Sequence, residues 1–144
     1  MDKPRINLVK LCVGAESVDS HIAWQKTTRI RTKDGFRRHV TRMWPKRAAE
    51  LLQGGSIYWV IKGAIQCRQR ILRLDEVPDH RGIVRCGIVL EEEIIRTQLA
   101  PKRPFQGWRY LKPEEAPDDL PASRQDDDVL PHELSLQLAQ IGVI

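Results

Sequence analysis

Three strand-like runs follow one another in the middle of the chain with only short turns between them, and this arrangement limits the fold more than any other feature of the sequence. The first run, SIYWVIKG at 56–63, is apolar at consecutive positions, which predicts a central strand covered on both faces. AIQCRQRILRLDEV at 64–77 and IVRCGIVL at 83–90 predict two more strands, separated by the turn-forming PDHRG at 78–82. Because a parallel pair needs a long crossover, strands joined by tight turns favour an antiparallel or mixed sheet over a doubly wound one.

The N-terminal part of the chain adds a strand, a helix and a hairpin to this prediction. INLVKLCV at 6–13 has the aliphatic, β-branched composition of a strand. Ser17 is a typical N-cap for a short helix that begins directly after it. Asp34-Gly35 favours a type I′ turn, in which both central residues need positive φ, and it predicts a hairpin between 27–33 and 36–42.

A second short helix is predicted for KRAAELL, because Pro45 suits a helix start and Gly54 can end the helix in a left-handed conformation. EEEIIRT at 91–97 is expected to form one helical turn, and RPFQGWRYL at 103–111 a last strand with a glycine in its middle. Together these segments predict an α+β fold: a small mixed or antiparallel β-barrel of five or six strands, with two short helices and a C-terminal helix.

Composition divides the chain into three parts. Residues 1–112 are expected to form a single β-barrel-like domain, since 144 residues rarely hold two independent cores. Residues 113–129 are acidic and rich in proline, which predicts an extended linker. Residues 130–144 predict an amphipathic helix with one apolar stripe, formed by Leu130, Leu134, Leu138 and Ile141. Because so short a helix is marginal alone, it is expected to dock on its own domain or on a partner protein.

Several classes of protein and of site are disfavoured. The apolar stretches are far shorter than the ~20 residues that span a bilayer, so no membrane association is expected. Three scattered cysteines (Cys12, Cys67 and Cys86) do not make a disulfide framework, which favours a cytoplasmic location. The four histidines are dispersed and no phosphate-binding or dinucleotide motif is present, so no metal and no cofactor are predicted.

Charge is distributed very unevenly along the chain. Residues 1–73 hold 16 basic and 5 acidic side chains, a net charge of +11, whereas residues 74–144 hold 8 and 14, a net charge of −6. Seven of the eight aromatic residues lie in two basic segments, 36–73 and 101–112. Cations suit phosphates and flat rings suit unstacked bases, so we expect a nucleic-acid partner, RNA more than duplex DNA. The acidic tail could also occupy this basic face itself.

The residues expected to contact nucleic acid are cations for the phosphates and two tryptophans for stacking. They are Arg38, Arg42, Trp44, Lys46, Lys62, Arg68, Arg103, Trp108 and Arg109. A structural role competes with this hypothesis, because Tyr58 and Trp59 point to opposite faces of one strand and at least one of them should fill the core.

Two other functions stay open. The first is a small hydrolase acting on a nucleoside-like or anionic substrate, in which His39 would be the base, Thr41 the nucleophile and Lys46 the anion clamp. The second is a protein–protein adaptor that binds its partner through residues 130–144.

Two long segments, TRMWPKRAAELLQGGSIYWVIKGAIQCRQRIL and RPFQGWRYLKPEEAPDDL, resemble a family of small uncharacterised bacterial proteins, a domain of unknown function. NLVKLCVG near the start fits as well, so the resemblance covers most of residues 7–120. It implies a bacterial cytosolic protein and transfers no catalytic residue.

The order of the elements also resembles PUA-like barrels, including the ASCH and EVE branches. That likeness implies binding of RNA or a modified base in a pocket, and some ASCH members hydrolyse an amide on a modified nucleoside. The Gly-Lys-Lys-Thr run of ASCH proteins is missing here, and its nearest equivalents, Thr41 and Lys46, are spaced differently. The resemblance therefore favours binding over amide hydrolysis.

Overall fold

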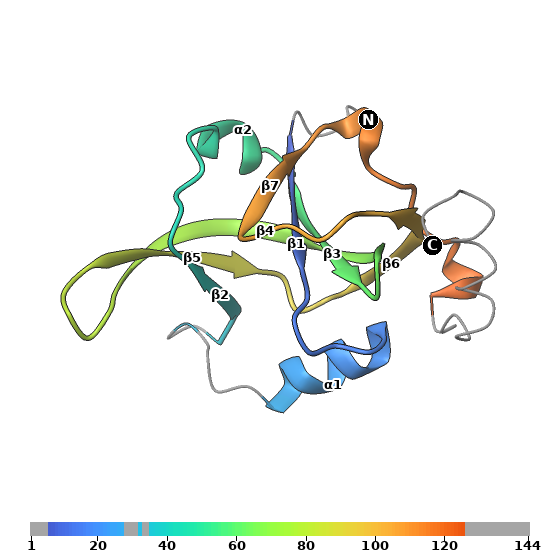
Figure 1. The fold of residues 1–144 in the computed structure, drawn as a ribbon, viewed down its shortest axis with the longest axis horizontal. Coiled ribbons are helices and arrows are strands. Elements are labelled where there is room, and N and C mark those ends of the chain that lie inside the picture. Colours follow the sequence, from blue (N-terminus) through green and yellow to red (C-terminus); the bar gives the residue numbers. More distant parts are fainter. Residues whose placement is uncertain (1–5, 28–31, 33–34, 126–144) are drawn as a thin grey trace.

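The structure is a computed structural model that describes residues 6–27, 32 and 35–125 (Figure 1). It contains a seven-stranded sheet and two short α-helices. The strands are β1 (Asn7–Leu11), β2 (Arg37–Thr41), β3 (Ser56–Ile61), β4 (Ala64–Pro78), β5 (Val84–Leu90), β6 (Ile95–Pro101) and β7 (Trp108–Leu111). The helices are α1 (Val18–Thr27) and α2 (Ala48–Leu51), and two 3-10 turns follow at Pro113–Glu115 and Ala122–Arg124. The three central strands and both helices lie where the sequence predicts them.

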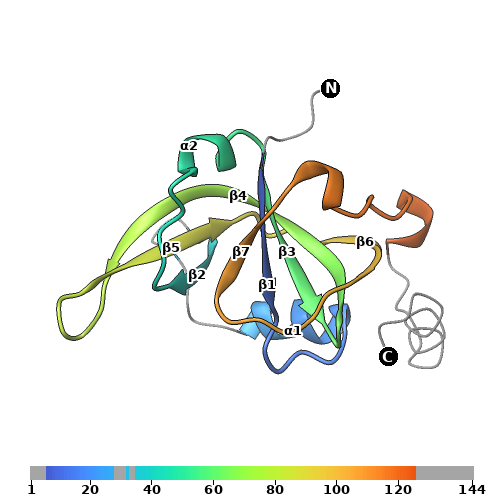
Figure 2. The ribbon, with the colours of Figure 1, turned by 45° about the horizontal axis from the view of Figure 1, so that its top comes forward.

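The sheet is mixed and is organised around β4. Its strand order is β2-β5-β4-β3-β1-β7, and β6 also pairs with β4. β1 runs parallel to β3, and the other strand pairs are antiparallel. The first part of β4 lies between β3 and β6, whereas the second part pairs with β5. The distal parts of β4 and β5 project from the body as a long two-stranded arm (Figures 1 and 2).

The pairing confirms the barrel prediction only in part. Within the described residues, the outer strands β2 and β7 do not pair with each other, so the sheet is not closed by hydrogen bonds. The fold is a mostly β structure with two short helices, and the predicted helix at 130–144 lies outside the described residues.

Three local predictions change in the structure. Residues 91–97 are not a helical turn. Residues 91–94 connect β5 to β6, and β6 pairs antiparallel with β4, so that Arg96 lies opposite Cys67. The last strand begins at residue 108 instead of 103, directly after Gly107, which has a φ of 68°. The predicted second arm of the hairpin forms β2, which pairs with β5, and most of the first arm lies outside the described residues.

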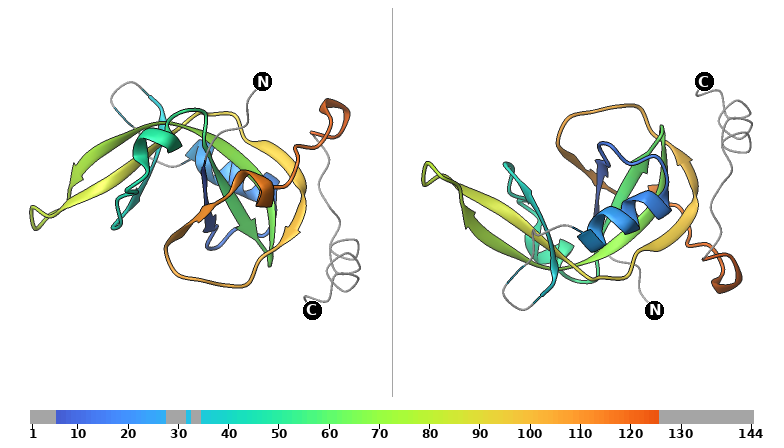
Figure 3. Two further views of the ribbon diagram at one scale, coloured as in Figure 1. Left: turned by 90° about the horizontal axis from the view of Figure 1, so that it is seen from above. Right: turned by 90° about the horizontal axis from the view of Figure 1, so that it is seen from below.

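Residues of β3 alternate between two cores, which explains why the whole strand is buried. Ile57, Trp59 and Ile61 face the larger core, where α1 packs through Val18. Tyr58 and Val60 face a smaller core on the opposite side of the sheet. Both aromatic residues of the adjacent pair are therefore core residues. The view from below shows α1 lying across the sheet (Figure 3).

Local sequence signals fix the ends of the two helices. Ser17 caps α1: its Oγ accepts a hydrogen bond from the backbone N–H of Ser20 at 3.0 Å, and Ser20 Oγ accepts one from the N–H of Ser17 at 3.0 Å. Gly54 has a φ of 94° after α2, as the sequence predicts. At Gly55 an added Cβ would lie 2.4 Å from the carbonyl oxygen of Leu51 and 2.7 Å from that of Ile6, so only glycine fits between α2 and β1.

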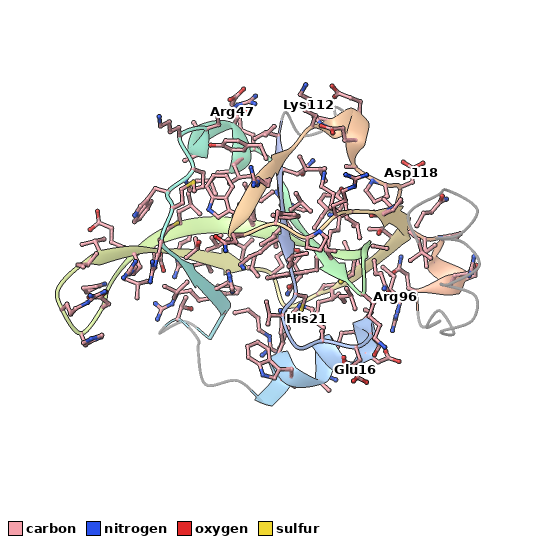
Figure 4. All side chains as sticks on the ribbon, in the orientation of Figure 1. Glu16, His21, Arg47, Arg96, Lys112 and Asp118 are labelled. Carbon is pink, nitrogen blue, oxygen red and sulfur yellow. The ribbon has the colours of Figure 1, made fainter. Side chains whose placement is uncertain are left out.

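The later part of the acidic segment, residues 118–125, lies beside β6, near the labelled Arg96 (Figure 4). The N–H of Gln98 donates to the carbonyl of Asp118 at 2.8 Å, and the N–H of Leu120 donates to that of Arg96 at 2.9 Å. The side chain of Gln125 donates to the Arg96 carbonyl at 3.1 Å. This part of the predicted linker is therefore bonded to the sheet.

Candidate functional site

A pocket of about 330 Å³ opens on the face of the sheet that α1 covers. Its walls come from four parts of the chain. These are the end of β1 with the loop after it, α1, β2 through His39, and β3 through Trp59. The labelled His21 of α1 points to this region in Figure 4. Its chemically functional lining residues are Lys10, Cys12, His21, Trp24, His39 and Trp59.

A second cavity of about 240 Å³ adjoins the first. His21, Trp24, His39 and Trp59 line both cavities. The second extends along β2, where Arg37 and Arg38 add positive charge to its lining. The two cavities therefore share their aromatic walls, and the second has a cationic end.

Trp59 is the centre of the aromatic lining. The His21 ring meets it edge to face, with 5.0 Å between the centroids and 61° between the planes. The His39 ring meets it at 5.5 Å and 88°. Trp24 is 60% exposed and stands at the edge of the site. Four flat side chains thus border one pocket.

Buried amide groups hold Trp59 in place. Its indole Nε1–H donates to Gln69 Oε1 at 2.9 Å. Since an indole nitrogen can only donate, this bond fixes which end of the Gln69 amide is oxygen. Gln69 and Gln25 then exchange two hydrogen bonds of 2.9 Å, and Gln69 Nε2 also donates to the carbonyl of Glu91 at 3.0 Å.

The same network determines where the proton of His21 lies. Gln25 Nε2 is 3.1 Å from His21 Nε2, and because that Gln25 atom is a donor, the histidine nitrogen must accept. A neutral His21 therefore carries its proton on Nδ1, which lies 3.1 Å from the sulfur of Cys12. The ring donates to the sulfur in this arrangement, so it is not placed to remove the proton of the thiol.

Burial keeps His21, His39 and Cys12 uncharged at neutral pH, and neighbouring cations add to this effect for the two histidines. Burial, with the charge of Arg37, lowers the pKa of His21 to about 4. Burial, with the charges of Lys10 and His21, lowers the pKa of His39 to about 4. Burial raises the pKa of Cys12 to about 11, against the opposing effect of Lys10. At neutral pH the site contains neutral imidazoles and a neutral thiol, which suit binding better than proton transfer.

His39 has a hydrogen-bonding atom to offer a ligand. Its Nε2 is buried and has no hydrogen-bond partner in the part of the chain that the structure describes. The same holds for Nε of Arg38 in the adjoining cavity. Among the described residues, no three His, Cys, Asp or Glu side chains gather in a way that could hold a metal ion.

The structure places the predicted nucleic-acid contacts in several different regions. Arg42, Trp44 and Lys46 are exposed on the segment between β2 and α2. Trp108 is only 5% exposed and donates from Nε1 to the carbonyl of Met43 at 2.9 Å, so its ring faces are inside the core. Of the two predicted stacking residues, Trp44 alone has substantial surface.

The remaining predicted cations are spread over both ends of the sheet. Lys62 lies in the turn between β3 and β4 with a φ of 51°, and Arg103 is close to it in space, because the N–H of Lys102 donates to the carbonyl of Gly63 at 2.9 Å. The guanidinium of Arg109 lies 5.7 Å from the centre of the Phe105 ring. Of the predicted cations, Arg38 is the one that lines the site under α1.

The residues of the predicted hydrolase site do not form one cluster. His39 and Thr41 lie on one face of β2, opposite Ile88 and Cys86 of β5. Lys46 is exposed on the segment before α2 and lines neither cavity of the site.

Sequence reasoning missed most residues of the site, among them Lys10, Cys12, His21 and Trp24. Two signals could have pointed to them. Lys10 interrupts an otherwise apolar strand, and His21 and Gln25 are spaced as neighbours on one face of a helix. Neither signal reveals that Lys10 lies opposite Trp59, because that pairing joins strands that are far apart in sequence.

A family model described as "Protein of unknown function (DUF1489)" matches residues 8–144. No curated protein and no solved structure shows significant similarity to the chain. Within the described residues, no helix has the length and apolar character needed to cross a membrane.

Proposed function

Since the chain belongs to the DUF1489 family, whose description assigns no function, we propose one from its own residues: a nucleic-acid-binding module that takes a single unstacked base into the pocket under α1. The observation that carries this proposal is the lining of that pocket. Trp24 and Trp59 border it together with two histidine rings that are neutral at neutral pH.

A base is the ligand that this lining suits. Stacking of a base on an aromatic side chain contributes about 1–3 kcal/mol and tolerates any base, since every base has a flat π-face. The unpartnered Nε2 of His39 can bond the polar edge of a base that enters the pocket. An unstacked base is available in single-stranded RNA, whereas a duplex would first have to be opened.

The cations around the site suit the phosphates of such a ligand. Arg37 and Arg38 line the adjoining cavity, and the exposed Lys62 and Arg103 offer further contacts farther away. The likeness to PUA-like barrels, which bind RNA or modified bases in a pocket, agrees with this proposal. With it we propose a barrel-like arrangement of the sheet and a bacterial, cytoplasmic protein.

Binding is better supported than hydrolysis. His39 and Thr41 are separated from Lys46, and His21 donates to Cys12 instead of accepting its proton. A base with a pKa of about 4 is also weak at neutral pH. The adaptor hypothesis rests on residues 130–144, which lie outside the described residues, and it stays a prediction.

The test is a titration of single-stranded RNA against the full chain at several salt concentrations. We expect the logarithm of the affinity to fall with the logarithm of salt concentration, with a slope of about −0.7 for each phosphate contacted. Trp24→Ala should weaken binding about tenfold, which corresponds to the loss of one stacking contact. The control is Trp44→Ala, because Trp44 is a partly exposed tryptophan that does not line the pocket.

The two variants separate two interfaces. A loss with Trp24→Ala and none with Trp44→Ala supports the pocket. The reverse pattern would move the interface to the segment between β2 and α2 and overturn the proposal, as would weak binding that does not respond to salt.

A further inference from the structure

We propose that Lys10 is the counter-ion for an anionic group of the pocket ligand, and that the ligand class is therefore a nucleotide with a free terminal phosphate. This inference rests on the proposed function and narrows it. The pocket would take a base and its phosphate together, and not an internal base whose phosphate stays outside. Either a free nucleoside monophosphate or the end of an RNA strand has this chemistry.

The position of Lys10 in the sheet is unusual for a lysine. It lies on β1 between two neighbouring strands, opposite Trp59 of β3 on one side and Trp108 of β7 on the other. Both tryptophans are buried, and Lys10 itself is only partly exposed. Residues directly opposite each other in a sheet share a face, so Lys10 lies on the same face as both tryptophans, and it lines the pocket.

Lys10 has no acidic partner among the described residues, unlike several of the arginines. Within the residues described, no hydrogen bond or ion pair involves its side chain. Arginines on several elements do have carboxylate partners: the pairs include Arg37–Glu92, Arg47–Glu50, Arg68–Asp119, Arg73–Asp75, Arg85–Asp79 and Arg96–Asp19. A cation removed from water without a partner is unfavourable, and an anion beside it restores the lost interaction.

The surroundings of Lys10 favour an anion from outside the chain. No aspartate or glutamate is among the described residues that line either cavity, although the chain has 19 acidic residues. The neighbouring thiol of Cys12 and the imidazole of His39 are neutral at neutral pH and do not compete for the ammonium. Burial lowers the pKa of Lys10, as expected for a cation that lacks a partner.

A ring and an anion can be bound together because both groups that recognise them line the same pocket. Lys10 and Trp59 are direct neighbours across β1 and β3, and His39 contacts the same indole. A ligand whose base stacks within this pocket therefore has its phosphate within the surroundings of Lys10, or of Arg37 in the adjoining cavity. Lys10 is the better candidate, since Arg37 already bonds Glu92 and Arg38 lines only the adjoining cavity.

The experiment compares the four nucleoside 5′-monophosphates with the four matching nucleosides by calorimetry on the full chain. We expect at least one monophosphate to bind about tenfold or more tightly than its nucleoside, as is typical of a hydrogen bond to a charged group. Lys10→Met should remove this difference while leaving nucleoside affinity within about twofold. Lys26→Met is the matched control, because Lys26 is an exposed lysine on α1 that does not line the pocket.

The melting temperature of each variant shows whether a change in affinity comes from a loss of folded protein. Lys10→Met removes a partly buried cation without a partner, so its melting temperature should be unchanged or higher than that of the unmodified chain. If Lys10→Met fails to fold, Lys10→Gln takes its place. The comparison of monophosphate with nucleoside in the unmodified chain decides the question in either case.

The outcomes separate this inference from the proposed function. If RNA binds through Trp24 but monophosphates and nucleosides bind equally, the inference is overturned and the proposed function stands. If RNA does not bind through Trp24, the proposed function fails. Single-stranded oligonucleotides with a 5′-phosphate, a 3′-phosphate or no terminal phosphate then identify the source. Tighter binding of a phosphorylated oligonucleotide than of the monophosphate indicates an RNA end, and the reverse indicates a free nucleotide.

Discussion

Asp119 binds the guanidinium of Arg68 through both of its carboxylate oxygens. Arg68 Nε and Nη2 each donate to Asp119 at 2.7 Å, and Nη1 donates to Ser56 Oγ at 2.9 Å. This geometry is the one in which arginine binds a phosphate. A residue expected from sequence to contact nucleic acid is thus held by a carboxylate from the acidic segment, 51 positions later in the chain.

We predict that Asp119→Asn releases Arg68 and strengthens RNA binding. A plot of the logarithm of the affinity against the logarithm of the salt concentration should become steeper by about 0.7, the contribution of one additional phosphate contact on a single strand. Asp118→Asn is the control, because it removes the same charge at the neighbouring position without breaking a bond to Arg68. Equal effects of the two variants would mean that charge alone, and not release of Arg68, changes the affinity.

The buried Gln69 should be more important for stability than its polar side chain suggests. Gln69→Leu removes the acceptor of Trp59 and both bonds to Gln25. Because each buried polar group left without a partner costs about 1–3 kcal/mol, we expect the free energy of unfolding in urea to fall by at least about 2 kcal/mol. Gln98→Leu, at an exposed position of β6, should change it by less than about 0.5 kcal/mol. A small effect of Gln69→Leu would show that the network is not required.

The two histidines of the pocket should make stability depend on pH. Their pKa values are lowered to about 4 in the folded chain, whereas an unfolded histidine has a pKa of about 6.5. The unfolded chain therefore binds more protons between these values, and the stability present above pH 6.5 is lost as the pH falls toward 4. Urea unfolding at pH 7, 6, 5 and 4.5 measures this loss.

Two histidine variants test whether this loss of stability at low pH comes from the pocket. His39→Gln should make the decline in stability shallower, because one of the two histidines that gain a proton on unfolding is gone. His80→Gln, on the exposed turn of the β4–β5 arm, should leave the decline unchanged. If His39→Gln follows the unmodified chain at every pH, the lowered pKa of His39 is wrong.

Gly55 should tolerate no side chain. In Gly55→Ala the new Cβ would meet two backbone carbonyl oxygens, those of Leu51 and Ile6, and neither can move without shifting α2 or the start of β1. We expect a loss of about 3 kcal/mol or more in the free energy of unfolding. In Gly14→Ala the new Cβ meets no atom within 4 Å, and the φ of 86° is the only source of strain. We therefore expect a loss of about 1–2 kcal/mol in the free energy of unfolding. Similar losses for the two would contradict the close approach at Gly55.

Local patterns were enough to predict the elements whose own residues decide their structure. The apolar run of β3, the tight turns that flank β4 and the Ser17 cap of α1 each act over a few residues. β6 was missed for a different reason. Its residues follow three glutamates and become a strand because they meet the free edge of β4, a partner that no local pattern reveals.

The site was harder to predict than the fold because it depends on contacts across the chain. His39 and Arg38 were singled out from sequence and do line it. Lys10 and His21 were not, because their importance comes from Trp59, which the parallel pairing of β1 with β3 brings next to Lys10 and the packing of α1 brings next to His21. Trp108 shows the converse: its basic surroundings in sequence suggested a stacking residue, but the hydrogen bond to Met43 holds it in the core.

The 15 residues of β4 also limit how this protein can be divided in the laboratory. The strand supplies one edge to β3 and the other to β6 and β5, so a fragment that ends before β4 loses one of the two partners of β3, and one that begins after it loses the partners of β5 and β6. The first fragment would retain only the pair of β1 with β3 and the second would retain no strand pair, and both would expose strand edges that promote aggregation. Expression as separate halves should therefore fail, whereas the turn at 79–82 is the place to insert a tag or a fluorophore.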